Sequence, residues 1–334
     1  MSDLLRFVQV RSGRIVATVF LIGASLGWSG CSEGEVFDPD RAVHLAFSGE
    51  QALDHVKQQV VIGPRIPGSK NLEKTRQYLE RELTGTGWDV ERQVFQQLTP
   101  FGIVEFVNLR ARFAAKPESG QKLSEKKHAQ IWERPVIGLV TSHYDTKKFN
   151  AFEFVGANDP GSSVGILLEM ARVLAERPEV AGKLELVFFD GEEAFVDYSD
   201  TDGLYGSRYY AESLGRWPEK SRPKWGVLLD MVGDRDLAIR VPEDSPTTLV
   251  AFLFAAAEDI DLRKYFGYGS QMITDDHIPL NEAGIPTINI IDMDYGFWHT
   301  PGDTVDKLST ESLEVVGRVT LLMIEKYLLD KSDL

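Results

Sequence analysis

The sequence predicts an α/β fold, in which a central and mostly parallel mixed sheet is flanked by helices. Short apolar runs alternate along the chain with longer segments whose apolar residues follow helical spacing. Strands that alternate with helices in this way form parallel sheets that are covered by helices on both faces. A chain of 334 residues is long enough for one large domain with a sizeable core, and we find no internal repeat in the sequence.

The elements can be followed in order from Ser48, which is placed to cap the first helix. Gly85 and Gly87 end the second helix, and Pro160 and Gly161 open the third. The predicted helices cover 51–60, 72–83, 161–174, 206–214, 246–257 and 310–329. The predicted strands cover 88–98, 103–113, 136–142, 184–189, 225–229 and 286–291. The polar, lysine-rich stretch 115–134 is predicted to be a surface insertion.

Two neighbouring glutamates, Glu192 and Glu193, follow the apolar run 184–189 through a tight Asp-Gly turn. In open α/β sheets, ligands bind at the carboxyl ends of the strands. Two adjacent carboxylates repel each other there unless a cation or a shared proton separates their roles. We therefore interpret one of them as a metal ligand and the other as a general base, whereas the simpler alternative is a solvated acidic turn.

Further candidate metal ligands lie at the ends of three other predicted strands and before one predicted helix. They are His143, Asp145, Asp159, Asp230 and His299. Imidazole nitrogen and carboxylate oxygen suit Zn²⁺, and a catalytic zinc site keeps three protein ligands and one open position. Several such residues at strand ends of one chain therefore predict a zinc site.

The first thirty residues have the pattern of a targeting segment. Three arginines precede the short apolar run 15–26, and Cys31 follows shortly after it. This is typical of a bacterial lipoprotein signal peptide over 1–30, whose cleavage leaves Cys31 as the lipidated first residue, although Trp28 stands where a small aliphatic residue is usual. The alternative is an uncleaved signal anchor, for which the apolar run is short.

These boundaries predict a tether over 31–46 and a folded domain over 47–334. The protein is expected to be an exported bacterial lipoprotein that is anchored to a membrane through Cys31, in the periplasm or at the cell surface, and to act as a monomer. Cys31 is the only cysteine, so no disulfide can form within the chain. A net charge of −15 argues against nucleic acid as a partner.

Several motifs together resemble a known family. The order of HYD at 143–145, GANDPGSS at 156–163, DGEE at 190–193, Asp230 and WHTPGDT at 298–304 is similar to the M28 zinc-peptidase family. More narrowly, DGEEAF, LYGSR at 204–208, DDHIP at 275–279 and the Trp298-His299 pair resemble the glutaminyl cyclases of that family. The resemblance covers roughly 48–330, and it implies that 47–334 is an M28-type α/β sandwich that acts as a zinc catalytic domain.

The resemblance to glutaminyl cyclases implies one zinc ion, bound by Asp159, Glu193 and His299. It also implies a substrate, namely a peptide or protein with N-terminal Gln, which is converted to pyroglutamate with release of ammonia. The α-amine would attack the γ-amide carbon of the same residue while zinc polarises the carbonyl. Glu192 matches the catalytic residue that takes a proton from the amine and delivers it to the leaving nitrogen.

The same resemblance assigns supporting roles. Asp230 and Asp275 match carboxylates that contact the substrate or support the site, so Asp230 could hold the substrate amine and Asp275 could hydrogen-bond Glu192. Trp298 matches an indole that lines the pocket. Tyr198 stands where glutaminyl cyclases carry a tryptophan, and its ring is expected to line the substrate pocket instead. Lys147, beside HYD, is expected to be exposed.

An M28 aminopeptidase with two zinc ions is the main alternative. His143 and Asp230 could hold a second zinc ion, with Asp159 bridging the two ions, Asp145 orienting His143 and Glu192 activating water. The ligands alone do not decide between one and two ions; the DDHIP segment and Trp298 favour the cyclase. A minor alternative is a non-catalytic surface lipoprotein that binds peptide or metal, which the presence of Glu192 disfavours.

Overall fold

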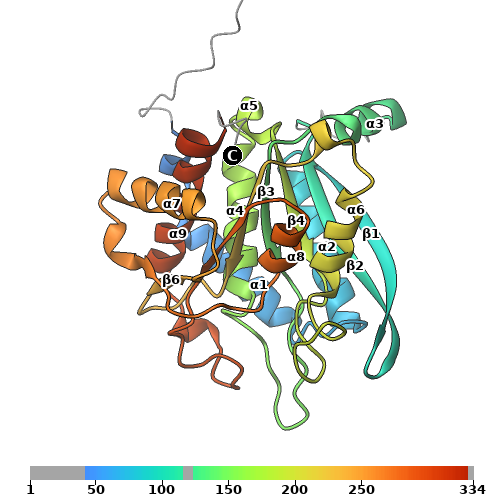
Figure 1. Ribbon diagram of the computed structural model, residues 1–334. Coiled ribbons are helices and arrows are strands. Elements are labelled where there is room, and N and C mark those ends of the chain that lie inside the picture. Colours follow the sequence, from blue (N-terminus) through green and yellow to red (C-terminus); the bar gives the residue numbers. More distant parts are fainter. Residues whose placement is uncertain (1–41, 116–122, 330–334) are drawn as a thin grey trace, which may run out of the picture. The chain divides into compact units, whose positions relative to one another are not determined.

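The computed structural model describes residues 42–115 and 123–329 (Figure 1). The predicted signal peptide over 1–30, Cys31 and the first part of the predicted tether lie outside the described residues, so export, lipidation and membrane attachment stay predictions. Within the described ranges, the helices are too short or too polar to span a bilayer.

The elements follow the predicted alternation closely. The strands are β1 (Trp88–Thr99), β2 (Gly102–Phe113), β3 (Gly138–His143), β4 (Leu184–Phe189), β5 (Trp225–Asp230), β6 (Ile239–Val241), β7 (Phe266–Tyr268) and β8 (Thr287–Ile291). The helices are α1 (Gly49–Ile62), α2 (Lys70–Gly85), α3 (Glu125–Glu133), α4 (Gly161–Leu174), α5 (Pro178–Ala181), α6 (Tyr205–Leu214), α7 (Thr247–Asp259), α8 (His277–Glu282) and α9 (Thr310–Leu322), which a π-helical turn (Met323–Leu328) extends. Short 3₁₀ turns are η2 (Val43–Ala46), η3 (Glu219–Ser221), η4 (Arg263–Tyr265) and η5 (Val305–Lys307).

The central sheet is mixed and has the strand order β1-β2-β4-β3-β5-β8. The neighbours β4, β3, β5 and β8 run parallel, whereas β1 and β2 form an antiparallel hairpin and β2 joins β4 in the antiparallel sense. A small parallel pair, β6 with β7, lies outside this sheet. The predicted α/β class with a mostly parallel mixed sheet is therefore confirmed.

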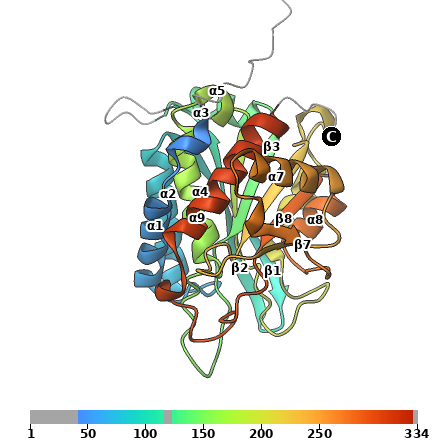
Figure 2. The ribbon, with the colours of Figure 1, turned by 90° about the vertical axis from the view of Figure 1, so that its left-hand side faces the viewer.

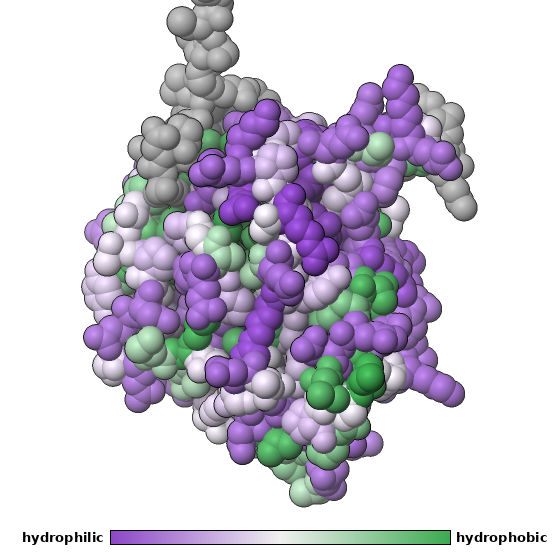
Figure 3. All heavy atoms as spheres, turned by 45° about the vertical axis from the view of Figure 1, so that its right-hand side comes forward, coloured by the Kyte–Doolittle hydropathy of each residue, from purple (hydrophilic) through white to green (hydrophobic). Residues whose placement is uncertain are grey.

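Helices cover both faces of the sheet, and the strand residues alternate between two apolar clusters. On β4, Leu186 and Phe188 belong to the large cluster with α4, α9 and α2, whereas Val187 and Phe189 belong to the smaller cluster with α6 and α8. Figure 2 shows α1, α4 and α9 side by side over one face. This alternation explains why the strand sequences are almost continuously apolar. On the surface drawn in Figure 3, hydrophilic residues predominate and the hydrophobic patches are small and separate.

Two sequence expectations differ from the structure. The insertion predicted over 115–134 contains α3, because Ser124 caps its first turn and Ile131 buries its side chain. Part of the predicted tether belongs to the folded unit: η2 places Val43 in the main core, and the backbone N–H of Val43 donates to Glu325 Oε2 at 2.9 Å. The packed chain therefore begins a few residues before the predicted start at 47.

A buried ion cluster joins the β1–β2 hairpin to the parallel strands. Glu185 of β4 is fully buried, and its two oxygens accept hydrogen bonds from the Nε atoms of Arg110 at 2.7 Å and Arg112 at 2.6 Å. Tyr210 of α6 donates its hydroxyl proton to the same carboxylate at 3.0 Å. Burial opposes ionisation of Glu185, but the two guanidinium groups outweigh it and lower the pKa of Glu185 below its ordinary value.

We expect Glu185→Gln to lower the free energy of unfolding at pH 7 by about 3–5 kcal/mol, because the two buried guanidinium groups lose their counter-charge. Urea denaturation gives the value, and Glu105→Gln, on an exposed position of β2, is the matched control. Because the folded-state pKa of Glu185 is depressed, its contribution is present above about pH 4.3 and is lost as the pH falls through the folded-state pKa. A deficit that stays constant as the pH falls below about 4.3 and through the folded-state pKa, or one no larger than that of the control, would contradict this assignment.

Candidate active site

Parallel strands bring the predicted site residues to one edge of the sheet. His143 is the last residue of β3, and Asp230 is the last residue of β5. Glu192 and Glu193 follow β4 through the turn at Gly191, which needs a positive φ of 74°. His299 comes from the loop after β8. The sequence therefore predicted correctly that these side chains lie at the carboxyl ends of neighbouring strands.

One group of three candidate ligands is formed by Asp159, Glu193 and His299. The Nε2 atom of His299 lies 3.3 Å from Asp159 Oδ2 and 3.1 Å from Glu193 Oε1. One ligand atom from each residue falls within a common distance of 4.8 Å, and both carboxylates are buried. These are the three residues that the resemblance assigned to a metal ion.

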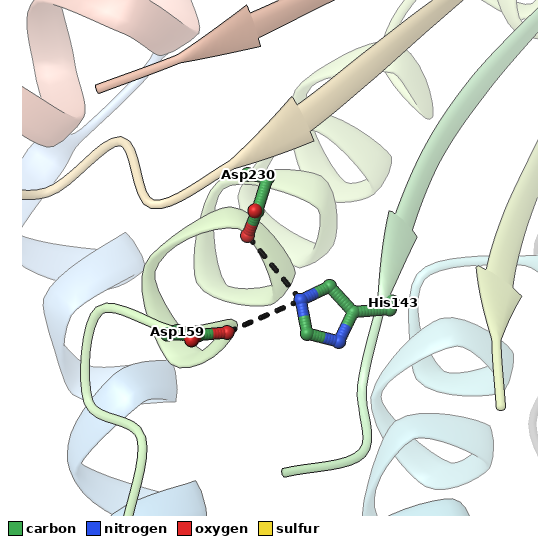
Figure 4. A group of neighbouring side chains, drawn as sticks. All are labelled: His143, Asp159 and Asp230. Carbon is green, nitrogen blue, oxygen red and sulfur yellow. Dashed lines mark hydrogen bonds and ion pairs between the residues drawn. The ribbon is translucent and has the colours of Figure 1, made fainter. Parts of the chain in front are cut away.

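A second group shares Asp159 with the first. His143 Nε2 lies 3.3 Å from Asp159 Oδ1 and 3.3 Å from Asp230 Oδ1, with all three side chains buried (Figure 4). Asp159 thus directs one oxygen toward His143 and the other toward His299. The structure brings together the ligands for one metal ion and those for two, as the sequence left open.

The chemistry of the donors fits a divalent cation. Each of the two imidazoles has its Nε2 atom 3.1–3.3 Å from two of the three carboxylates, and such O/N donor sets suit zinc. The imidazole of His299 holds a proton tightly: burial lowers its pKa, but the hydrogen bonds to Asp159 and Glu193 outweigh burial and raise the pKa to about 9. A bound cation would take the place of such protons, because metal ligation requires a neutral imidazole.

Glu192 lies beside this group and is not part of either triad. Its side chain is 5% exposed, and the hydroxyl of Tyr198 lies 3.0 Å from Oε1 and 2.9 Å from Oε2. The same hydroxyl is 3.2 Å from Glu193 Oε2, so Tyr198 lies between the two glutamates. Burial, together with the charges of Glu193 and Asp275, raises the pKa of Glu192 well above its ordinary value. A carboxyl group with a raised pKa binds a proton more readily than an ordinary glutamate, which suits a residue that takes up and returns a proton.

Asp275 also reaches the pocket, from the loop that precedes α8. Asn289 of β8 donates its amide N–H to Asp275 Oδ2 at 2.7 Å and fixes the orientation of the carboxyl group. Burial, and then the charge of Asp230, raises the pKa of Asp275 to about 7. Asn289 was not recognised in the sequence, because a single amide within a strand carries no signal of its partner.

Two carboxylates hold the backbone of the ligand-bearing turns. Asp145 accepts hydrogen bonds from the backbone N–H groups of Glu192 at 3.1 Å and Glu193 at 3.4 Å. Asp303 accepts from the N–H groups of Asn158 at 2.8 Å and Asp159 at 3.1 Å. For the two-zinc alternative, the sequence suggested that Asp145 orients His143. Asp145 Oδ1 lies 3.5 Å from His143 Nδ1, and the same carboxylate also holds the glutamate turn.

Arg65 is a supporting residue that sequence reasoning missed. Its guanidinium is fully buried and donates to the backbone carbonyls of Tyr144 at 3.2 Å, Val155 at 2.7 Å and Gly156 at 2.8 Å. It therefore links the turn after β3 to the loop that carries Asp159. Burial lowers the pKa of Arg65 to about 10, although nearby aspartates favour its charge.

Lys147 differs from its predicted position. It was expected to be exposed, but its side chain is only 14% exposed, its Nζ donates to the carbonyl of Ala194 at 2.7 Å, and it lies 3.5 Å from Glu193 Oε2. The ammonium group therefore offsets part of the negative charge on the outer side of the ligand group. It also lies 5.4 Å from the centre of the Tyr198 ring, as a cation over an aromatic face.

The ligands and Glu192 open into a pocket of about 230 Å³. Trp298 and Tyr198 both line it, as predicted, together with Asp230 and Asp275. The indole of Trp298 stacks on the His299 ring with centroids 4.3 Å apart. The remaining wall is largely apolar and consists of Met231, Met272, Ile273, Ile291 and Met293, with Gln271 and Thr274. The pocket thus pairs an acidic floor with an apolar wall.

Backbone strain is concentrated at this edge of the sheet. His299 and Met231, which directly follows Asp230, adopt left-handed conformations with φ of 54° and 48°. Leu204, in the loop that closes behind the glutamates, does the same with φ of 54°. Such conformations cost a non-glycine residue about 1 kcal/mol or more, and they concentrate at functional sites. The strain supports the assignment of this pocket as the functional site.

Comparisons with known proteins agree with this geometry. A model of the family described as "Peptidase family M28" matches residues 123–324. A glutaminyl-peptide cyclotransferase of Dictyostelium discoideum is 29% identical over 310 residues, which cover 84% of this chain and 85% of that protein. A solved glutaminyl cyclase from an Acidobacteriales bacterium is 31% identical, with a TM-score of 0.71, and the match covers 83% of this chain and 94% of that chain.

A solved Zn-dependent exopeptidase from Parabacteroides distasonis is similar to a comparable degree. It is 26% identical, with a TM-score of 0.70, over 83% of this chain and 98% of that chain. Overall similarity therefore does not distinguish a glutaminyl cyclase from a zinc-dependent exopeptidase. Because the family model matches well over half of the chain and the motif residues meet in one pocket, the chain belongs to peptidase family M28.

Proposed function

We propose that this protein is a zinc-dependent glutaminyl-peptide cyclotransferase, which converts the N-terminal Gln of peptides or proteins to pyroglutamate and ammonia. The observation that carries the proposal is the position of Asp275. This residue belongs to the DDHIP segment that resembles glutaminyl cyclases, and it lines the same pocket as Glu192 and the Asp159–Glu193–His299 triad. The relatives named as cyclotransferases or cyclases support the proposal over most of the chain.

Asp159, Glu193 and His299 would hold the zinc ion, which when bound supplies a Lewis acid for the γ-carboxamide carbonyl. The chain's own residues would perform the proton transfers. Glu192, as a carboxylate, accepts a proton from the substrate α-amine as its nitrogen bonds to the γ-carbon. The resulting carboxylic acid then donates that proton to the amide nitrogen as the carbon–nitrogen bond breaks and ammonia leaves.

The remaining pocket residues would position the substrate. Asp230 is available to accept a hydrogen bond from the α-amine, because its carboxylate lines the pocket. Trp298 and the apolar wall enclose the methylene groups of the glutamine side chain. The nucleophile belongs to the substrate itself, so no covalent enzyme intermediate is required. Holding the flexible side chain in the ring-closing geometry would supply much of the rate acceleration.

A two-zinc aminopeptidase remains the second candidate, on one specific observation. A second group of candidate ligands is formed by His143, Asp159 and Asp230, and Asp159 directs one oxygen toward each histidine, so it could contribute to both sites. Glu192 would then activate a water molecule for attack on the first peptide bond. The similarity to the Parabacteroides distasonis exopeptidase is compatible with this alternative.

Products distinguish the two candidates. The zinc-loaded domain is expected to remove one ammonia from a Gln-initiated peptide and to leave a Leu-initiated peptide of the same length intact. Glu192→Gln should keep the fold and the bound zinc but lower turnover by about 10²–10⁴-fold, because the proton shuttle is lost. Mass spectrometry follows the products, and Glu212→Gln, exposed on α6, is the matched control. Release of free Gln or Leu would establish the aminopeptidase, and full activity of Glu192→Gln would remove the general base assignment.

Tyr198→Phe tests the hydroxyl that lies between the two glutamates. The variant keeps the aromatic wall but loses the hydrogen bond of the hydroxyl to Glu192, so we expect kcat to fall by about 10-fold while KM and zinc content change little. Steady-state kinetics on a Gln-initiated peptide provide the measurement. Tyr209→Phe is the control, since the Tyr209 ring stacks on Phe95 away from the pocket. An unchanged kcat would show that the Tyr198 hydroxyl does not orient Glu192 during the reaction.

Metal content separates one-ion from two-ion chemistry. Chelation should abolish the activity, and one equivalent of zinc per chain should restore it fully if Asp159, Glu193 and His299 form the functional site. His143→Ala should leave this stoichiometry unchanged, whereas His299→Ala should lose the ion. Elemental analysis after equilibrium dialysis gives the number of ions. Two zinc ions per chain at saturation, with one lost in His143→Ala, would overturn the one-zinc proposal.

A further inference from the structure

A second depression lies directly beside the proposed active pocket. Its volume is about 400 Å³, and it shares Gln271, Ile273 and Met293 with the wall of the active pocket. The loop that follows β7 and leads to Asp275 therefore lines both depressions. A peptide whose first residue lies in the active pocket would have to continue outward, and the adjacent depression is a place where its next residues can lie.

The two depressions differ sharply in charge. The active pocket is lined by five carboxylates, from Asp159, Glu192, Glu193, Asp230 and Asp275. The charged residues that line the second depression are Arg240 and Asp294. Within the described part of the chain, Arg240 is thus the arginine or lysine that lines either depression.

The position of Arg240 is set by the small β6–β7 sheet. Its guanidinium lies over Gly267 of β7, where an added Cβ atom would come within 3.2 Å of Nη1. Arg240 also donates from Nη1 to the carbonyl of Ile239 at 3.1 Å. The glycine leaves room for the guanidinium to lie along the floor of the depression.

The ion pair between Arg240 and Asp294 is loose. Arg240 Nε lies 3.6 Å from Asp294 Oδ2, which is longer than a hydrogen bond, and the side chains are 42% and 64% exposed. Pairs of this kind contribute little to stability and exchange readily with other partners. A carboxylate from a bound peptide can therefore replace Asp294 as the partner of Arg240 at small cost.

We propose that the second depression is a binding subsite for the residues that follow the N-terminal residue of the substrate, and that Arg240 makes it selective for a peptide with an acidic side chain there. This subsite adds substrate selectivity to the proposed function, and it depends on that function for the position of the substrate's first residue. The carboxylates of the active pocket attract the positively charged N-terminus, while Arg240 offers a positive charge for an acidic residue further along. The preferred substrate would thus carry a positive end and a negative side chain a few residues away.

The test separates binding from turnover. Gln-initiated alanine peptides with a single Glu, moved from the second to the fifth position, are compared with the same peptides carrying Lys. Dissociation constants are measured by calorimetry on zinc-loaded Glu192→Gln protein. We expect Glu to bind about 3-fold more tightly than Lys at one or two adjacent positions, the size typical of a partly exposed ion pair, and the preference to shrink as salt is added.

Two variants, each made in the Glu192→Gln protein, should change the preference for Glu over Lys in opposite directions. Arg240→Gln should abolish the preference for Glu, and Asp294→Asn should increase it, because the guanidinium loses its competing partner. Lys220→Gln removes a cation from an exposed position on η3, before β5 and hence toward the opposite edge of the sheet, and should leave the preference unchanged. An equal loss in Lys220→Gln would point to overall charge and overturn the assignment to Arg240.

The outcomes for the subsite and for the activity can be told apart. If wild-type protein cyclises the peptides but Glu and Lys bind equally at every position, the subsite is wrong and the proposed function stands. If the preference is present and depends on Arg240, but the products are free amino acids, the subsite stands and the cyclase proposal fails. The absence of binding of all these peptides would overturn the subsite.

Discussion

The burial of negative charge at one edge of the sheet is the constraint on which the rest of this structure depends. Five carboxylates line a single pocket, and each of them is more than nine-tenths buried. An unpaired buried charge costs several kcal/mol, so each carboxylate needs a hydrogen-bond donor, a cation or a proton. The supporting residues supply such groups. Arg65 places a buried positive charge beneath the loop of Asp159, and Lys147 places a positive charge beside Glu193.

The groups that offset the buried negative charge differ between the two sides of the pocket. This difference gives neighbouring carboxylates different chemistry. Asp159 and Glu193 face imidazole nitrogens, where a divalent cation suits the donors. Glu192 faces the hydroxyl of Tyr198 and the carboxyl group of Asp275, where ionisation is disfavoured. Adjacent positions in one turn thus offer a candidate metal ligand and a candidate proton carrier. Asp145 fixes this turn, because it accepts hydrogen bonds from the backbone N–H groups of both glutamates.

The sequence predicted the fold and the meeting of the candidate site residues at one sheet edge, because both depend on local pattern. Candidate residues such as His143 and Asp230 directly end apolar strands, and parallel strands bring their ends together. The residues that were missed act through contacts between distant segments. Arg65 lies between Pro64 and Ile66 in a turn-rich stretch, yet its partners are 79–91 residues away. Local sequence shows a charged residue in a turn and predicts exposure, whereas the packing of two loops around Arg65 buries it.

The ligand set alone cannot explain why one M28 protein would cyclise and another hydrolyse, because Asp159 presents an oxygen to each histidine in either case. What separates the reactions is the nucleophile. Cyclisation competes with attack by water on the same γ-carbonyl, which would release ammonia but leave glutamate. A cyclase site must therefore exclude water from one side while it holds a polar amine on the other. Ile273, Ile291 and the indole of Trp298 line the same pocket as the carboxylates and are the apolar surface available for this purpose. Under the proposed function, selectivity for cyclisation would therefore depend on the apolar wall as much as on the metal ligands.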